Sequence, residues 1–416
     1  MRERKIYMSK SGKSKMLAAV IGCLVVQLCV GILYVWSVFK QPAIDFFGWE
    51  AGSVNLVASF MLFCFCFGNL IGGIIQDRIG PKPVCIMGIC LFGGGILISS
   101  FLPASSPIVL FYLTYCLIAG MGSGFAYGSV LSCMQKWFPH KRGFASGLGA
   151  SAFGLSTVVF SPVISALLGS MSLSRTLMVL SILFLVVGVV ACLFISLPDQ
   201  SYLAGLHLPA AASPAAGADN SKTLAQAART LPFWLLFLGC FLFNGTWNML
   251  TPLINGLGIE RGLSSSMAVL CVSLTGLTNA AGRLIMASLS DKLGRINTLH
   301  VLCVMTIVCA LLLIFVPGYA YFIVVLVTAF AYGGPAAVNP ATSTDFFGPK
   351  YSGTNYGVIM LALGLSSVVF NAISNALYSA TGAYTMTFIM GAVTAAVSIV
   401  IYVVIDKLNK KQKAKA

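Results

Sequence analysis

Long apolar stretches recur along the whole chain and alternate with short polar breaks that carry charges, prolines or glycines. A helix that crosses the hydrocarbon core of a bilayer needs about 20 mostly apolar residues, and each stretch is roughly of this length. The spans that begin near 144 and 354 are the least apolar, and they are included because they give even spacing and two matching halves. The pattern predicts twelve membrane-spanning helices, at residues 17–38, 53–76, 83–101, 107–131, 144–167, 176–196, 232–254, 266–289, 297–316, 320–343, 354–377 and 384–405.

Composition points to lipid as the solvent of this chain. Hydrophobic residues make up 58% of the 416 residues, charged residues make up 8%, and the mean hydropathy is +0.94. A soluble domain carries about 25% charged residues, so this chain cannot cover itself with a water-facing surface. The first apolar stretch is longer than the roughly 7–15 residues of a signal-peptide core. We therefore expect an all-α membrane protein whose first apolar stretch is an uncleaved span.

Basic residues are distributed unevenly between the two sides that this topology creates. An even number of spans places both termini on one side, which carries 21 Lys and Arg residues, whereas the other side carries Lys40, Arg175 and Arg261. Cytoplasmic loops of membrane proteins are rich in Lys and Arg. We expect a multi-pass protein of the cell membrane, in bacteria the inner membrane, with both termini in the cytoplasm. The net charge of +15 suits anionic lipid headgroups, and no nucleic-acid partner is expected.

A polar turn occurs twice in matching positions. Asp77-Arg78-x-Gly80 follows the second span, and Asp291-Lys292-x-Gly294 follows the eighth. Such a repeat indicates two parallel halves of six helices, and the alanine- and proline-rich segment between them suits a flexible tether. The predicted units are a basic N-terminal segment, a first half, a cytoplasmic linker, a second half and a basic tail, at residues 1–16, 17–196, 197–231, 232–405 and 406–416.

Residues for catalysis or metal binding are not placed to act together. His140 and His207 fall in loops, His300 lies near a helix end, and none of the ten acidic residues lies deep in a span. The thirteen cysteines lie mostly inside spans without a CxxC pair, which is typical of small apolar residues. An enzyme needs a convergent set of such groups. We therefore expect a protein that is not an enzyme and that uses no metal or cofactor.

The repeated turn resembles the signature loop of the major facilitator superfamily. Members of that family are transporters with twelve transmembrane helices in two pseudo-symmetric six-helix halves, so the resemblance implies this fold. In the family, the acidic residue of the loop locks one conformation by bonding helix ends and charges of a neighbouring span. The resemblance therefore implies a conformational latch formed by Asp77, Arg78, Asp291, Lys292 and Arg295.

A narrower resemblance runs through both halves. Four segments are similar to those of the oxalate/formate antiporter family and its lactate-transporting relatives: Tyr34-x-Trp36-Ser37-x-Phe39, Lys136-Trp137-Phe138-Pro139, Phe233-Trp234 and Asn355-Tyr356-Gly357.

Arg283 is the one basic residue expected inside a span. It lies eight residues before Asp291, about 12 Å from the loop at ~1.5 Å per residue, which is close to the middle of the hydrocarbon core. A charge there costs a few kcal/mol, and no acidic residue lies in a span to pair with it. A carboxylate from solution would match its planar fork, and in the resembled family an arginine of span eight does bind substrate carboxylate. The alternative is an arginine that extends to the membrane interface.

Several polar residues are candidates for the same site. Asn279 lies one turn before Arg283 on the same helix face, where it can orient the guanidinium. Asn248 belongs to a polar stripe on span seven that must face protein or water, and helix packing explains such a stripe equally well. Tyr34, Tyr127 and Tyr332 lie on the helices that line the cavity in the resembled fold, although each is also compatible with ordinary packing.

The identity of Leu363 restricts the class of carboxylate that we expect as substrate. Oxalate exchangers of the resembled family carry a lysine within span eleven, and alignment on Asn355-Tyr356-Gly357 places Leu363 at that position. One arginine neutralises one carboxylate, so a dianion would keep an unpaired charge at high cost. We therefore expect Leu363 to determine substrate selectivity in favour of monocarboxylates.

These features predict a secondary active transporter of small organic anions that works by alternating access. The expected substrate is a monocarboxylate such as lactate, pyruvate or formate, carried by proton symport or by anion exchange. An exchanger of the dicarboxylate oxalate for formate is one alternative, and a drug or sugar transporter is another, which the lone buried cation disfavours. The expected partners are the carboxylate and the lipid bilayer, and the expected state is a monomer.

Overall fold

The computed structural model describes residues 10–199, 202 and 221–413. These residues form twelve helices that are long and apolar enough to cross a membrane, so the predicted all-α fold of twelve spans is confirmed. Ten of the twelve helices begin before the predicted spans and nine end after them, because a helix continues into the interfacial layer once its apolar core has crossed the membrane.

The first six spans lie in residues 10–194. The first span is interrupted by a 3₁₀ turn, and the fourth contains a stretch of π-helix, so each of these spans consists of three segments. In chain order the segments are α1 (Lys10–Val30), η1 (Gly31–Val35), α2 (Trp36–Phe47), α3 (Ala51–Ile79), α4 (Pro81–Ser100), α5 (Ile108–Phe111), η2 (Tyr112–Ala119), α6 (Gly120–Trp137), α7 (Arg142–Ser170) and α8 (Leu173–Phe194).

The last six spans lie in residues 231–413, and a short helix precedes them. The seventh span is again segmented. In chain order the segments are α10 (Leu224–Ala228), α11 (Leu231–Phe243), α12 (Gly245–Leu250), η3 (Thr251–Leu253), α13 (Ile254–Glu260), α14 (Ser265–Leu293), α15 (Arg295–Phe315), α16 (Gly318–Phe347), α17 (Ser352–Thr381) and α18 (Thr385–Lys413).

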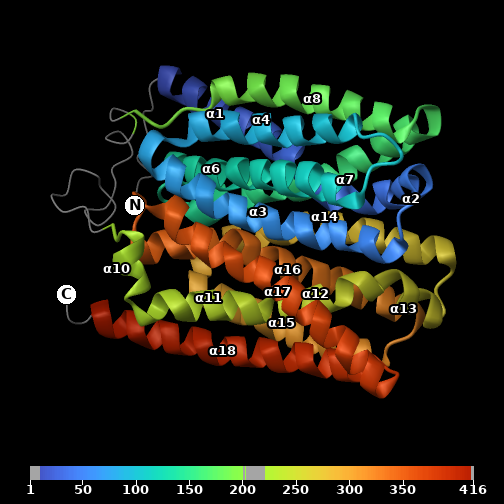
Figure 1. Cartoon of the computed structure of the whole chain (residues 1–416). Helices are drawn as coiled ribbons and strands as arrows, with labels where there is room; N and C mark the ends of the chain where they lie inside the picture. Colours follow the sequence, from blue (N-terminus) through green and yellow to red (C-terminus); the bar gives the residue numbers. More distant parts are fainter. Residues whose placement is uncertain (1–9, 200–201, 203–220, 414–416) are drawn as a thin grey trace.

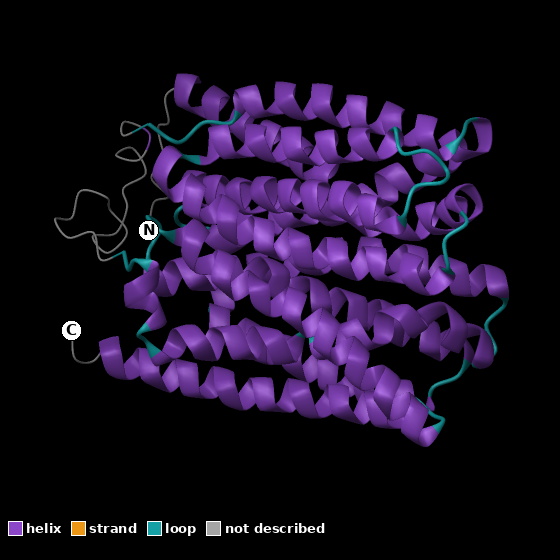
Figure 2. Ribbon diagram, in the orientation of Figure 1, coloured by secondary structure: helices purple, strands orange, loops and turns teal. Residues whose placement is uncertain are grey.

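The long helices run side by side and the connecting loops lie at the two ends of the bundle (Figure 2). The beginning of α1 and the end of α18 lie at the same end (Figure 1), which we call the terminal end; the opposite end is called the far end. The first half and the second half lie beside each other, and the main contacts between them pair α3 with α17 and α7 with α14.

Matching glycines end the second helix of each half. Gly80 follows α3 with φ +86°, and Gly294 follows α14 with φ +88°. Residues with a Cβ rarely adopt this backbone region, whereas glycine does so at little cost. The repeated sequence turn therefore has the same conformation in both halves.

Small residues allow the helices to approach closely, as is common in membrane bundles. Gly124 of α6 faces α3, where an added Cβ would overlap the carbonyl oxygen of Phe65 and the amide nitrogen of Asn69. Gly94 of α4, in contrast, has no atom within 4 Å of an added Cβ.

Gly124→Ala is therefore expected to destabilise the fold by about 1–3 kcal/mol, because overpacking at a backbone contact forces two helices apart. The thermal unfolding midpoint of the purified protein in detergent measures this. Gly94→Ala is the matched control and should leave the midpoint unchanged. An equal midpoint for both variants would contradict the close packing of α3 on α6.

Candidate functional site

A small cavity lies between the two halves, midway along the bundle. Its free volume is about 20 Å³, which is room for about one water molecule. A larger ligand therefore requires the halves to move apart. The cavity is lined by Phe65, Tyr127, Phe153, Cys240, Asn244, Arg283, Tyr332, Pro335, Ala336, Asn339, Tyr356, Met360 and Leu363.

Arg283 of α14 is the charged group of this cavity. The residue is 2% exposed, so its side chain remains inside the bundle and does not extend to the interface. Its Nη1 donates a hydrogen bond of 3.0 Å to the carbonyl oxygen of Ala150 on α7, and the guanidinium lies 5.8 Å from the centre of the Phe153 ring. Ala150 and Phe153 belong to the other half, so Arg283 connects the halves at the cavity.

Asn279 orients this guanidinium. Arg283 Nε donates a hydrogen bond of 2.8 Å to Asn279 Oδ1, and Asn279 Nδ2 donates a bond of 3.3 Å to the carbonyl oxygen of Ala329 on α16. The second bond holds the amide so that its oxygen faces the arginine. The structure thus brings together the two residues that helical spacing placed on one face.

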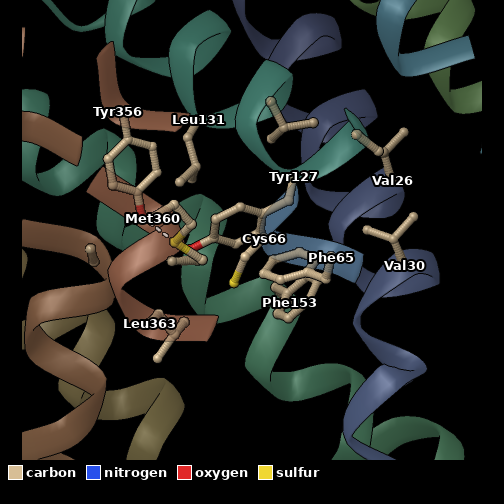
Figure 3. Packing of buried hydrophobic residues seen from close by; sticks show 14 of the residues in the cluster. Val26, Val30, Phe65, Cys66, Tyr127, Leu131, Phe153, Tyr356, Met360 and Leu363 are labelled. Atoms are coloured by element: carbon tan, nitrogen blue, oxygen red, sulfur yellow. Dashed lines mark hydrogen bonds between the residues drawn. The ribbon is translucent and has the colours of Figure 1, made fainter. Parts of the chain in front are cut away.

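Aromatic side chains line the same cavity as the arginine. Tyr127 packs edge-on against Phe65 and Phe153, with ring centres 5.2 Å and 4.9 Å apart. Tyr332 stacks on Trp247 at 5.2 Å. Figure 3 shows Tyr127, Phe65 and Phe153 of the first half opposite residues of α17. Tyr127 and Tyr332 both line the cavity.

The remaining predicted site residues lie in different places. Leu363 lines the cavity. Asn248 is buried outside the cavity lining, where its Nδ2 donates a hydrogen bond of 3.1 Å to Ser366 Oγ. Asn244, one turn earlier in the same polar stripe, lines the cavity instead. The side chain of Tyr34 lies outside the described residues.

Several residues that line the cavity were not predicted from the sequence. Phe65, Phe153 and Met360 are ordinary apolar residues of apolar spans, so their types carry no signal. Tyr356 belongs to the Asn355-Tyr356-Gly357 segment, and its hydroxyl donates a hydrogen bond of 3.1 Å to Met360 Sδ (Figure 3). Asn339 could have been identified as a candidate from the sequence, because it is an amide residue followed by a proline inside a span.

Two carboxylates at the terminal end bond to helices of the opposite half. Asp77 accepts hydrogen bonds of 3.2 Å and 2.7 Å from the backbone N–H groups of Gly353 and Thr354, in the first turn of α17. Asp291 accepts bonds of 2.9 Å and 2.8 Å from Gly143 and Phe144, in the first turn of α7. The first turn of a helix has unpaired N–H donors and a partial positive charge, so each carboxylate caps a helix across the interface.

Within the described residues, Asp291 takes part in a network of ion pairs, whereas no ion pair includes Asp77. Arg295 Nη1 pairs with Asp291 at 2.7 Å, and Arg295 Nε pairs at 2.8 Å with Asp345. Asp345 also pairs at 2.9 Å with Arg142 of the first half. Arg78 and Lys292 are exposed, and the ion pairs within the described ranges include neither. The network thus contains Asp345 and Arg142, which sequence reasoning did not select.

Comparison with known proteins places the chain in one family. The family model described as "Major Facilitator Superfamily" matches residues 16–370. The oxalate:formate antiporter of Oxalobacter formigenes is 28% identical over 84% of this chain and 81% of its own length. Monocarboxylate transporter 13 of Rattus norvegicus is 30% identical over 40% of this chain and 37% of its own.

Solved structures share the fold. The transporter FucP in its outward conformation superposes with a TM-score of 0.71 at 14% identity, over 94% of this chain and 99% of that chain.

Proposed function

The chain belongs to the major facilitator superfamily, whose members are membrane transporters, and on this premise we propose that it transports a short-chain monocarboxylate such as lactate, pyruvate or formate by alternating access. The observation that carries the proposal is Arg283, a buried cation in the cavity between the halves. Its contacts with Asn279, Ala150 and Phe153 are contacts with neutral groups.

A carboxylate is the ligand that suits this arginine. A guanidinium fork and a carboxylate form two parallel charge-assisted hydrogen bonds, which strengthen where water is excluded. Asn279 holds Nε, so the fork is oriented before a ligand arrives and less conformational entropy is lost on binding. The named activities of the relatives, an oxalate:formate antiporter and a monocarboxylate transporter, support a carboxylate.

A single cation favours a monocarboxylate over oxalate. Arg283 is the one cationic residue among the described residues that line the cavity, and Leu363 contributes an apolar surface there. Oxalate would bring a second negative charge into a site without a second cation, and an uncompensated buried charge is costly. The proposed substrate therefore differs from the dianion in the name of the Oxalobacter relative.

The terminal end is proposed to face the cytoplasm. The described loops at this end carry most of the basic residues, whereas the far end carries Lys40, Arg175 and Arg261. This distribution agrees with the positive-inside rule.

We propose that Asp77 and Asp291 hold the terminal end closed while the far end opens. Each carboxylate bonds two N–H groups at the start of a helix in the other half. When the halves rock apart at this end, both sets of bonds must break, so the carboxylates set the relative stability of the two states, and neither of them lines the cavity.

Arg283→Gln is expected to weaken carboxylate binding strongly while the protein still folds, because it removes the cavity's fixed positive charge. Arg283→Lys keeps the charge without the fork and should bind more weakly. A charge-assisted bond contributes roughly 1.5–3 kcal/mol, so the loss in affinity for Gln is about 10- to 150-fold. Equilibrium binding of lactate to purified protein measures it.

Arg175→Gln removes an exposed charge on α8 and serves as the control that should bind lactate normally. Unchanged affinity of the Arg283→Gln variant for lactate, pyruvate and formate would overturn the proposed function.

Asp77→Asn should slow transport while lactate affinity stays within about threefold, because an amide caps the first turn of α17 more weakly than a carboxylate does. Flux into proteoliposomes gives the rate, and equilibrium binding gives the affinity. Asp199→Asn is the control: Asp199 forms an exposed pair with Lys15 that does not join the two halves, and such pairs contribute little. Loss of binding in a well-folded Asp77→Asn protein would argue against a latch.

Leu363→Lys is expected to weaken lactate binding and to allow oxalate binding, because the second cation compensates the second carboxylate. Competition of labelled lactate by unlabelled oxalate tests both variant and wild type. Wild-type protein that binds oxalate as tightly as lactate would show that the single-cation argument is wrong.

A further inference from the structure

We propose that Asn339 accepts a hydrogen bond from a hydroxyl group of the substrate, so that the transported acid is a short-chain hydroxy monocarboxylate such as lactate or glycolate. This inference rests on the proposed function, because it takes Arg283 as the group that binds the carboxylate. Pyruvate and formate, which carry no hydroxyl group, would then be weaker ligands of the same site.

Asn339 is a buried amide with an unused acceptor. It lies on α16, is 2% exposed and lines the same cavity as Arg283. Within the described residues, its Oδ1 accepts no hydrogen bond, and its amide lies beside the thiol of Cys240. Buried polar atoms without a partner are rare because they lose their hydration without compensation. The unpaired Oδ1 of Asn339 on the cavity wall is explained if the bound substrate donates a hydrogen bond to it.

The next residue supplies a second acceptor on the same wall. Pro340 has no N–H, so it cannot donate the helical hydrogen bond to the carbonyl oxygen of Ala336, four residues earlier. Ala336 also lines the cavity. Its carbonyl oxygen accepts a hydrogen bond of 3.4 Å from the hydroxyl of Tyr127, which is long for an O–H···O bond. The wall formed by α16 therefore presents two acceptor oxygens, and that of Asn339 has no hydrogen-bond donor within the described residues.

A neutral donor suits this wall better than a charged one. No acidic side chain occurs among the described residues that line the cavity, and Arg283 already places a positive charge there. An ammonium group, as in an amino acid, would add a second positive charge that two dipolar oxygens do not neutralise. A hydroxyl group donates one hydrogen bond without a charge.

The small size of the cavity indicates a short molecule. Its free volume is about 20 Å³ in this closed conformation, so even after some opening the donor must lie close to the carboxylate. A 2-hydroxy acid of two or three carbons meets this requirement. A site that hydrogen-bonds a hydroxyl group disfavours the analogue that lacks it, since the analogue leaves the buried acceptor unpaired.

Lactate and propanoate provide the test. The two anions have the same charge and the same number of carbons, and they differ in the 2-hydroxyl group. Equilibrium binding of each to the purified full chain should give wild-type affinity about tenfold higher for lactate, the effect of one well-formed hydrogen bond. In Asn339→Leu, whose side chain has a similar shape, lactate binding should weaken about tenfold and propanoate binding should stay within about threefold.

Ser343→Ala is the matched control. Ser343 lies one turn further along α16, is buried, and also has an unpaired oxygen, but it does not line the cavity. Its substitution should change neither affinity. Asn339→Ala provides a second variant if Asn339→Leu does not fold, with the same loss of preference expected.

The outcomes separate this inference from the proposed function. Equal wild-type affinities for lactate and propanoate, or a preference that persists without the Asn339 amide, would overturn the role of Asn339 and leave the monocarboxylate function standing. Failure of wild-type protein to bind either acid would overturn the proposed function itself, and this inference with it.

Discussion

Arg283 places a positive charge inside a bundle that lipid surrounds, and the centre of the structure is arranged around that charge. An arginine at this depth costs about 2.5–3.5 kcal/mol on insertion scales, so it persists only with partners. Asn279 and the carbonyl oxygen of Ala150 accept its hydrogen bonds, and the Phe153 ring lies beside it. These partners come from both halves, so the charge is stabilised at the interface that must open for transport.

The same pair of helices carries the contacts at the cavity and at the terminal end. Arg283 and Asp291 both lie on α14, and their acceptor and donor partners, Ala150 and Gly143, both lie on α7. A ligand that competes for the Arg283 guanidinium therefore acts on the helix pair that Asp291 joins. The second pair, α3 and α17, is joined at the terminal end by Asp77 and contributes Phe65 and Leu363 to the cavity. Binding and closure thus share the same structural elements.

The fold could be predicted from the sequence more completely than the site. Twelve spans could be predicted because hydrophobic length is a local property that each segment carries by itself. Arg283 stood out because a charge in an apolar span is rare and costly, and Asn279 followed from helical spacing. Asn248 and Asn244 belong to one stripe, however, and sequence did not indicate which of them lines the cavity. The span is segmented at this point, and its rotation depends on packing against both α17 and α18.

The sequence by itself determined the membrane fold, the two repeated halves and the one buried cation, because these depend on hydropathy, repetition and charge along the chain. Only the tertiary structure decided which residues meet across the halves. Asp345 joins Arg142 to Arg295, and Asn339 reaches the cavity wall with its oxygen unpaired. Such contacts join segments far apart in the sequence, and they depend on how each helix is rotated about its axis, which the packing of neighbouring helices fixes and local residue pattern does not.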